Sequence, residues 1–231
     1  MTAPISLVIP TLNAEHDLPQ CLAVLAEGLT TGLIRELVVS DGGSSDATCE
    51  IADAVGAELV QGPSSRGGQL RRGVAATRAE WVMIVHADTV LDPGWTAVVG
   101  AHVAQPDAPP AYFRLAFRDG GRRGQLVACW ANLRATLFSL PYGDQGLLVR
   151  RRDYEAVGGY PDQPLMEDVA LIRALAREGA LKPVALPVTA RTSAARYRRS
   201  GWLRRGASNL WTLARYFSGA DPERLAARYN R

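Results

Sequence analysis

Short apolar runs alternate with amphipathic stretches through the first half of the chain. Each run stops at proline, aspartate, histidine or another polar residue, as buried parallel strands do. We expect strands at residues 5–10, 36–40, 58–60 and 81–85. Between them we expect helices at residues 18–26, from Ser45 or Asp46 to Ala54, and at 69–78. Three strand-helix repeats in about ninety residues predict a mainly parallel sheet with helices on both faces.

The second half has a less regular pattern. Apolar runs predict strands at residues 111–117, 145–150 and 184–192, the last of them antiparallel. Helical spacing predicts helices at residues 125–140, 154–160, 166–178 and 202–217, and the final helix is basic and aromatic. The fold class is therefore α/β, with a mixed sheet and a C-terminal basic helix. Nothing in the pattern divides residues 1–231 into more than one domain.

Composition narrows the class of protein. The hydrophobic fraction is 47%, the charged fraction 21% and the net charge +3, so the chain has the make-up of a globular protein without a need for nucleic acid. Cys21, Cys49 and Cys129 are odd in number and have no metal-ligand spacing, which indicates free thiols in a reduced compartment. No leader and no long apolar segment is apparent. We expect a cytoplasmic protein, at most peripheral at the inner face of the membrane.

Polar residues follow several of the expected strands. Asn13 follows the first strand, Asp41 and Asp46 follow the second, and His86 and Asp88 follow the fourth. Ligands of open α/β sheets bind beyond the carboxyl ends of the strands, so these side chains should share one rim. The pair Asp41 and Asp46 could equally form only a turn and a helix cap. Asp88 at an equivalent strand end favours a ligand site.

Five segments, taken together, carry a family resemblance. They are Val8–Glu15, Val39–Thr48, His86–Asp88, Gly143–Gly146 and Glu167–Asp168. In this order and spacing they resemble family-2 glycosyltransferases of the Rossmann-like GT-A fold, over nearly the whole chain. Residues 141–146, 158–161 and 165–169 are also similar to a small bacterial subgroup labelled arsenosugar-biosynthesis glycosyltransferases.

The resemblance implies a donor site for a nucleotide sugar in residues 1–110. It implies that Pro10, Asn13, Glu15 and Asp41 line the nucleoside pocket. A carboxylate such as Asp41 can accept hydrogen bonds from a base or ribose. Arg66 either pairs with the donor diphosphate or is a solvated loop arginine.

Asp88 matches the last acid of the D-x-D motif of the family. The resemblance implies that Asp88 binds Mg²⁺ or Mn²⁺, both of which prefer oxygen ligands. His86 stands where the family has its first acid, which leaves two interpretations. His86 is either a second metal ligand or a partly buried spacer bonded to the backbone.

The resemblance places the acceptor and catalytic half in residues 111–195. It implies that Asp168 is the general base of an inverting transfer, and that Asp144, Gln145 and Glu167 contact the acceptor. The pair Glu167–Asp168 could otherwise only complement a helix dipole, and Asp144 could only belong to a turn.

The tail at residues 196–231 is helical by pattern and rich in arginine and aromatic residues. A basic aromatic helix can lie on anionic lipid, close the active site, or pack on the domain or on a second subunit as a homodimer. If the tail folds over the pocket, we expect Arg191, Tyr197 and Arg198 to approach the diphosphate.

The sequence therefore predicts inverting transfer of a sugar from a nucleotide-diphosphate donor, a UDP-sugar, to a hydroxyl acceptor. Two alternatives stay open. The first is a sugar-phosphate nucleotidyltransferase, although the expected Gly-rich basic loop is replaced by Thr11–Ala14. The second is a non-catalytic module that binds nucleotide sugars or recruits the protein to a membrane.

Overall fold

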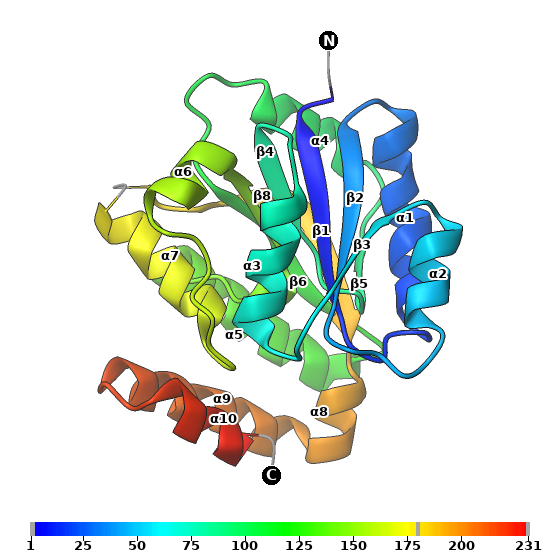
Figure 1. Cartoon of the computed structure of the whole chain (residues 1–231). Coiled ribbons are helices and arrows are strands. Elements are labelled where there is room, and N and C mark those ends of the chain that lie inside the picture. Colours follow the sequence, from blue (N-terminus) through cyan, green and yellow to red (C-terminus); the bar gives the residue numbers. More distant parts are fainter. Residues whose placement is uncertain (1–2, 179–180, 230–231) are drawn as a thin grey trace.

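The computed structural model describes residues 3–178 and 181–229, so both ends of the predicted 1–231 domain lie outside the described residues. Within them an 8-stranded sheet has the order β3-β2-β1-β4-β7-β6-β8-β5 (Figure 1). The strands are β1 (Ile5–Thr11), β2 (Ile34–Asp41), β3 (Glu58–Gln61), β4 (Trp81–Ile84), β5 (Thr89–Leu91), β6 (Ala111–Arg118), β7 (Leu147–Arg150) and β8 (Val184–Ser193).

Helices follow most of the strands in sequence. They are α1 (Leu18–Thr30), α2 (Thr48–Ala54), α3 (Arg66–Ala76), α4 (Trp95–Val103), α5 (Gly121–Phe138), α6 (Arg151–Ala156), α7 (Glu167–Glu178), α8 (Ala195–Ser200), α9 (Trp202–Phe217) and α10 (Pro222–Tyr229). A 3₁₀ turn, η1 (Gly143–Gln145), precedes β7.

The sheet is mostly parallel, as the sequence predicts. Strands β3, β2, β1 and β4 run parallel to one another. β7 pairs antiparallel with β4 and with β6. The expectation that residues 184–192 are antiparallel holds only against the short strand β5; along most of its length β8 is parallel to β6. The reason is that the chain between β6 and β8 crosses over through α7 and re-enters in the same direction.

Apolar layers cover both faces of the sheet, which confirms the prediction of helices on both sides. On one face, Leu18 and Leu25 of α1 and Trp95 of α4 are buried in one cluster with the β1 residues Ile5, Leu7 and Ile9. On the other face, Leu70 of α3 and Val169 of α7 are buried in a cluster with Val8. The alternation along β1 follows from the period of two in a strand.

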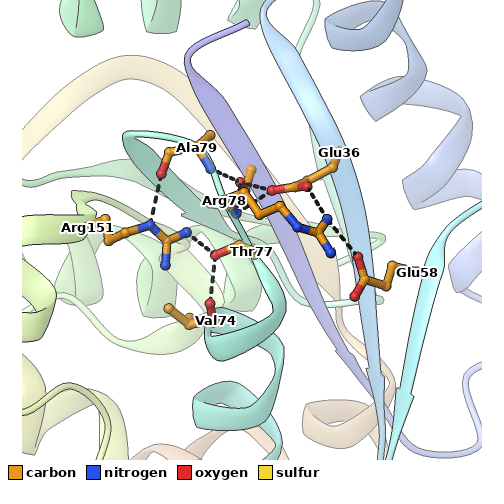
Figure 2. Close-up of polar contacts among 8 residues, drawn as sticks. Glu36, Glu58, Val74, Thr77, Arg78, Ala79 and Arg151 are labelled. Atoms are coloured by element: carbon orange, nitrogen blue, oxygen red, sulfur yellow. Dashed lines mark hydrogen bonds and ion pairs between the residues drawn. The ribbon is translucent and has the colours of Figure 1, made fainter. Parts of the chain in front are cut away.

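A polar network joins the amino ends of the parallel strands (Figure 2). The Glu36 carboxylate accepts from the Ser6 hydroxyl at 2.6 Å and pairs with the Arg78 guanidinium at 3.0 Å, and Arg78 also reaches Glu58 at 3.2 Å. Arg151 donates to the Ala79 carbonyl at 3.0 Å. These contacts tie β1, β2, β3, α6 and the loop before β4 together, at the edge remote from the strands' carboxyl ends.

Several boundaries differ from the expected ones. α5 begins at Gly121 rather than at residue 125, although its first turn is rich in glycine. A Cβ on Gly124 would lie 3.0 Å from the Trp202 ring, so this weak helical turn is covered by tertiary packing. The helix expected at 154–160 spans Arg151–Ala156 instead. Strand β5 and helix α4 were not expected, and the helical tail expected at residues 196–231 is divided into α8, α9 and α10.

The last three helices lie across the carboxyl ends of β1 and β2, at the bottom of Figure 1. α8 follows directly from β8, and α9 and α10 pack against each other. Among the described residues, none of the helices combines the length and the apolar character needed to cross a bilayer. The tail therefore covers the sheet edge where the sequence predicts a ligand site.

Candidate active site

Two adjoining cavities lie at the carboxyl edge of the sheet. The larger, about 790 Å³, is bounded by the residues after β1 and β4, the start of α3, the loop before α7 and the C-terminal helices. The smaller, about 110 Å³, lies against η1 and α7. Arg66, His86, Asp88 and Leu165 line both. The two cavities therefore share one wall, which contains the predicted metal ligand.

Most of the predicted site residues meet here. Those that line the larger cavity are Pro10, Asn13, Arg66, Asp88 and Glu167. Those that line the smaller cavity are Arg66, Asp88, Asp144 and Asp168. Glu15, Asp41 and Gln145 line neither cavity. Asp88 and Asp168 are 80 positions apart in the chain and come from separate elements, yet they share the smaller cavity.

Asp41 is fully buried behind the cavity wall. Its two carboxylate oxygens accept from the Thr11 hydroxyl, the Gly43 and Ser44 N–H groups and the Ser44 hydroxyl, at 2.5–3.0 Å. Burial alone would raise the pKa of Asp41, but these four donors outweigh it and hold the pKa below its usual range. Thr11, one of its donors, does line the larger cavity. Asp41 thus holds the turn after β2 in place from behind Thr11 and does not itself line the cavity.

Glu15 also fixes this turn. Its carboxylate accepts from the Ala47 N–H at 3.1 Å, and its own N–H donates to Asp46 at 3.1 Å. Asn13 accepts from the Ser45 N–H at 2.9 Å through its side-chain oxygen. The loops after β1 and β2 are therefore cross-linked, and of these polar side chains Asn13 is the one that lines the cavity.

Asp168 is held at both oxygens by backbone groups. Its Oδ2 accepts from the Gly143 N–H at 2.7 Å, and its Oδ1 accepts from the Val169 N–H at 2.7 Å. A Cβ on Gly143 would lie 2.9 Å from the His86 ring. Burial lowers the pKa of His86, while the neighbouring Asp88 opposes that shift, so His86 is a neutral imidazole near pH 7.

Asp144 and Gln145 are adjacent but have different surroundings. Asp144 lines the smaller cavity, and its Oδ1 has no hydrogen-bond partner among the described residues. Burial raises the pKa of Asp144 to about 6. Gln145 is fully buried. Its amide nitrogen donates to the Phe113 carbonyl and to Oδ1 of Asn132, and its amide oxygen accepts from the Tyr142 N–H, each at 3.3 Å. The expected acceptor contact of Gln145 is therefore not available in this geometry; the side chain holds the η1 turn instead.

Arg66 and Glu167 form an ion pair across the cavities, with Nε and Oε1 3.5 Å apart. Burial raises the pKa of Glu167 to about 7, against the opposing effect of Arg66. The second Glu167 oxygen, Oε2, is buried without a hydrogen-bond partner in the described part of the chain. Arg66, expected to be either a phosphate ligand or a solvated residue, lines both cavities, and its role stays a prediction.

Two of the non-glycine residues with positive φ lie at this site. Asn13 has φ 50° and Met166 has φ 65°. Such conformations cost about 1–3 kcal/mol and persist where the surroundings fix them. Met166 directly precedes Glu167 and Asp168, so its backbone sets the direction in which both acids enter α7.

The C-terminal helices supply a wall of the smaller cavity, of which Tyr197 alone was expected from the sequence. Its members are Arg196, Tyr197, Arg205, Asn209 and Tyr229. Asn209 donates to the Tyr197 hydroxyl at 3.0 Å and accepts from the Tyr229 hydroxyl at 2.9 Å. The Arg205 guanidinium lies 4.0 Å from the Tyr229 ring centroid. The alternation of arginine and aromatic residues in the tail is the sequence feature from which this wall could have been predicted.

Two arginines expected near the diphosphate lie elsewhere. Arg191 forms a two-point ion pair with Asp92, at 2.5 and 2.9 Å. Arg198 is exposed and lines neither cavity. Only Tyr197 of the three expected tail residues reaches the site. Arg191 belongs to β8 and pairs with Asp92, and Arg198 projects about 100° away from Tyr197 around α8.

The oxygen donors at this site fit a divalent cation that the protein would bind together with the phosphate oxygens of a bound molecule. No group of three or more His, Cys, Asp or Glu side chains within residues 3–178 and 181–229 is arranged to hold a metal alone. Among the described residues, the Asp88 carboxylate accepts hydrogen bonds only from the Thr89 and Thr192 hydroxyls, at 3.4 and 3.3 Å, both through Oδ1. Mg²⁺ typically binds through one or two carboxylates together with phosphate oxygens and water.

Comparison with known families identifies a match over more than half of the chain. The family model described as "Glycosyl transferase family 2" matches residues 6–144. A PGL/p-HBAD biosynthesis glycosyltransferase of Mycobacterium bovis is 37% identical over 99 residues, which are 39% of this chain and 38% of the relative. The aligned part thus spans less than two fifths of that curated relative.

Solved structures of glucosyl-3-phosphoglycerate synthase from Mycobacterium tuberculosis are similar over more of the chain. The complex with Mn²⁺, UDP and glucosyl-3-phosphoglycerate has a TM-score of 0.59 and 25% identity, covering 90% of this chain and 78% of the other. The complex with Mn²⁺ and UDP-glucose has a TM-score of 0.57 and 27% identity, covering 79% and 69%.

Proposed function

The chain belongs to glycosyl transferase family 2, and we propose that it moves a sugar from a UDP-sugar donor to a hydroxyl acceptor with inversion at the anomeric carbon. The observation that carries this proposal is the shared cavity of Asp88 and Asp168. A single-displacement transfer needs a base on the acceptor side and charge compensation on the leaving-group side of one sugar. Two carboxylates from separate elements on one small cavity meet that need.

On the donor side, the larger cavity has a volume in the range of small-molecule sites. Pro10 and Asn13 would contact the nucleoside, and Arg66 would pair with the diphosphate. Asp41 and Glu15 stay predictions as donor ligands. For Asp41 to accept from a base or ribose, Ser44 or Thr11 must first release it, because its two oxygens already accept four hydrogen bonds. The related synthase has been solved with UDP and UDP-glucose.

Asp88 would hold a Mg²⁺ or Mn²⁺ ion together with the donor diphosphate. Such an ion supplies positive charge that stabilises the departing diphosphate. Structures of the related synthase contain Mn²⁺ or Mg²⁺, which supports the same requirement here. His86 lines both cavities as a neutral imidazole, so either a ligand or a spacer role remains compatible with its position.

On the acceptor side, Asp168 would remove the proton of the attacking hydroxyl. The two N–H groups on its carboxylate fix its orientation and leave lone pairs facing the cavity. The acceptor oxygen then bonds to the anomeric carbon while the bond from that carbon to the diphosphate breaks, and UDP leaves with the electron pair. Asp144 would position the acceptor in the smaller cavity, with Gln145 supporting the η1 turn from behind. Glu167, which lines the larger cavity and pairs with Arg66, stays a prediction as an acceptor contact.

Replacing Asp168 with Asn tests the proposal. We expect the turnover number to fall about 10²–10⁴-fold, the usual contribution of a general base. The stabilisation of the protein by UDP with Mn²⁺ in a thermal-shift assay should stay as in the wild type, because the donor contacts are intact. Glu178→Gln, at the exposed far end of the same helix, is the matched control and should retain activity. Full activity of Asp168→Asn would remove this residue from the mechanism.

Product analysis separates the two alternatives. A glycosyltransferase releases UDP from a UDP-sugar, whereas a nucleotidyltransferase working with UTP and a sugar phosphate releases pyrophosphate. A non-catalytic module would be stabilised by a UDP-sugar and release neither product. The proposal requires UDP release that depends on a divalent cation and on an added hydroxyl compound.

A further inference from the structure

Helix α5 exposes its large apolar side chains to solvent, whereas a core helix buries such side chains. The face that packs on β6 consists of small residues, among them Gly124, Ala128, Ala131 and Ala135. The opposite face has Leu126, Trp130, Leu133 and Leu137, which are 74, 49, 47 and 65% exposed. Their spacing of four, three and four residues places them in one stripe along the helix.

Among the exposed large apolar residues of the described chain outside α5, Leu203, Leu210, Trp211 and Phe217 lie on α9, where three of them are spaced by seven residues. The remaining four are scattered. Leu12, Leu29, Val55 and Val184 belong to four different elements or loops. Single apolar residues on a surface are ordinary, whereas a contiguous apolar patch marks an interaction site. The α5 stripe therefore calls for a partner that covers it.

The start of α9 lies beside the first turn of α5, on the side that carries Gly124. A Cβ on Gly120 or Gly124 would lie 3.4 or 3.0 Å from the Trp202 ring, so α9 begins against the first turn of α5. Leu203, the next residue, is 91% exposed. Arg204 follows it and is exposed as well.

The charge around the stripe has one sign. The sequence has no Asp or Glu between residues 120 and 138 or between 194 and 220. The exposed arginines on these helices include Arg122, Arg123, Arg198, Arg199 and Arg204. Asp119, just before α5, and Asp221, just after residue 220, are the acids at the borders of these stretches.

We propose that the outer face of α5 and the first turn of α9, which we call the α5–α9 surface, dock on an anionic lipid surface. Leucine and tryptophan side chains that enter the acyl boundary, flanked by arginines that meet anionic headgroups, are what binds a helix in the plane of a membrane. This contact needs no spanning helix. It does not depend on the proposed glycosyl transfer, since neither the stripe nor these arginines belong to the reacting groups.

A second copy of the chain fits this surface less well. In a two-fold dimer the same patch meets itself, so the arginines would face a surface without carboxylates in these helices. An anionic lipid surface offers the missing negative charge. The docked face would also adjoin the smaller cavity, because Phe117 packs on both Trp202 and Tyr197 and lines that cavity together with Tyr197.

Vesicle co-sedimentation of the full chain tests the proposal, with vesicles of phosphatidylcholine alone and with about 30% phosphatidylglycerol. We expect sedimentation with the anionic vesicles and little with the neutral ones, weakening as salt rises from about 50 to about 500 mM. Leu133→Glu should reduce the bound fraction at least about tenfold, because it places a charge in the stripe. Leu29→Glu, a similarly exposed leucine on α1, is the matched control and should bind like the wild type.

Equal binding by Leu133→Glu and the wild type, or no binding to anionic vesicles, would overturn the proposal. The proposal would also be wrong if light scattering showed a wild-type homodimer that Leu133→Glu dissociates, while the wild type did not sediment with vesicles. The stripe would then be an interface between two copies of the chain. Circular dichroism checks that the variants are folded. UDP release by the same preparations, measured without vesicles, shows separately whether the proposed transfer is present.

Discussion

The backbone N–H of Gly143 donates a 2.7 Å hydrogen bond to Oδ2 of Asp168. This contact joins the η1 turn to the start of α7, two segments that are 25 positions apart in the chain. On its other side Gly143 meets the His86 ring, which a Cβ would approach to 2.9 Å. Gly143 thus spaces the proposed base from the histidine that precedes Asp88.

Gly143→Ala should lower activity with little loss of stability. The added methyl group must displace the His86 ring or the η1 backbone, and a displacement near 1 Å costs about 10²-fold in rate when reacting groups depend on it. Steady-state kinetics and a thermal melt of the same sample give both quantities. Gly206→Ala is the control: no atom lies within 4 Å of a Cβ at this position in α9, so activity should persist. Wild-type activity in Gly143→Ala would show that this close packing has no catalytic importance.

Asp144→Asn should gain stability relative to the wild type as pH rises from 4 to 7. Burial raises the pKa of Asp144 from 3.8 to about 6. Between these values the folded chain holds a proton that the unfolded chain has lost, so wild-type stability falls with rising pH. Asn has no such proton, and the relative gain reaches at most about 3 kcal/mol.

Denaturant unfolding of both proteins at several pH values, with a chelator present, measures this gain. The Asn amide carries its own burial cost, but that cost does not change with pH, so the slope rather than the absolute difference is diagnostic. A difference that stays constant from pH 4 to pH 7 would mean that Asp144 ionises as in water.

The strand ends illustrate what sequence patterns can predict. Apolar runs with an abrupt polar stop locate β1, β2 and β4, and parallel pairing then brings Asn13 and Asp88 to one edge without further information. The family resemblance is confirmed by the match to residues 6–144. The subgroup labelled arsenosugar biosynthesis stays a prediction, as do the roles of the single site residues.

Side-chain direction was not predictable from the same patterns. Asp144 and Gln145 are neighbours with similar polarity, yet the η1 turn sends one into the cavity and the other into the interior. Asp41 stands at the right strand end but is turned into its own loop by four donors. Helix α4 was missed because it is apolar almost all round and has no helical period to detect.

Asp88→Asn should abolish the metal-dependent part of nucleotide binding. An amide oxygen is a weaker ligand for a hard cation than a carboxylate, so UDP should stabilise the variant equally with and without Mn²⁺. In the wild type, UDP with Mn²⁺ should raise the melting temperature more than UDP alone. Asp92→Asn is a control four positions on, because Asp92 pairs with Arg191 away from both cavities. An undiminished Mn²⁺ effect in Asp88→Asn would assign the cation to other ligands.

Ser139→Gly should stabilise the protein by about 0.5–1 kcal/mol, because Ser139 ends α5 in the left-handed region. Its φ is 49° and ψ 43°, a conformation that costs a residue with a Cβ about 1–2 kcal/mol. Glycine removes this cost and loses part of the gain to its greater freedom in the unfolded chain. Ser218→Gly is the matched control at the end of α9, where φ is −80° and the hydroxyl donates to the Ala214 carbonyl. That substitution removes a hydrogen bond and relieves no strain, so it should destabilise. Denaturant midpoints of the two variants should therefore move in opposite directions, and a parallel shift would contradict the strain assigned to Ser139.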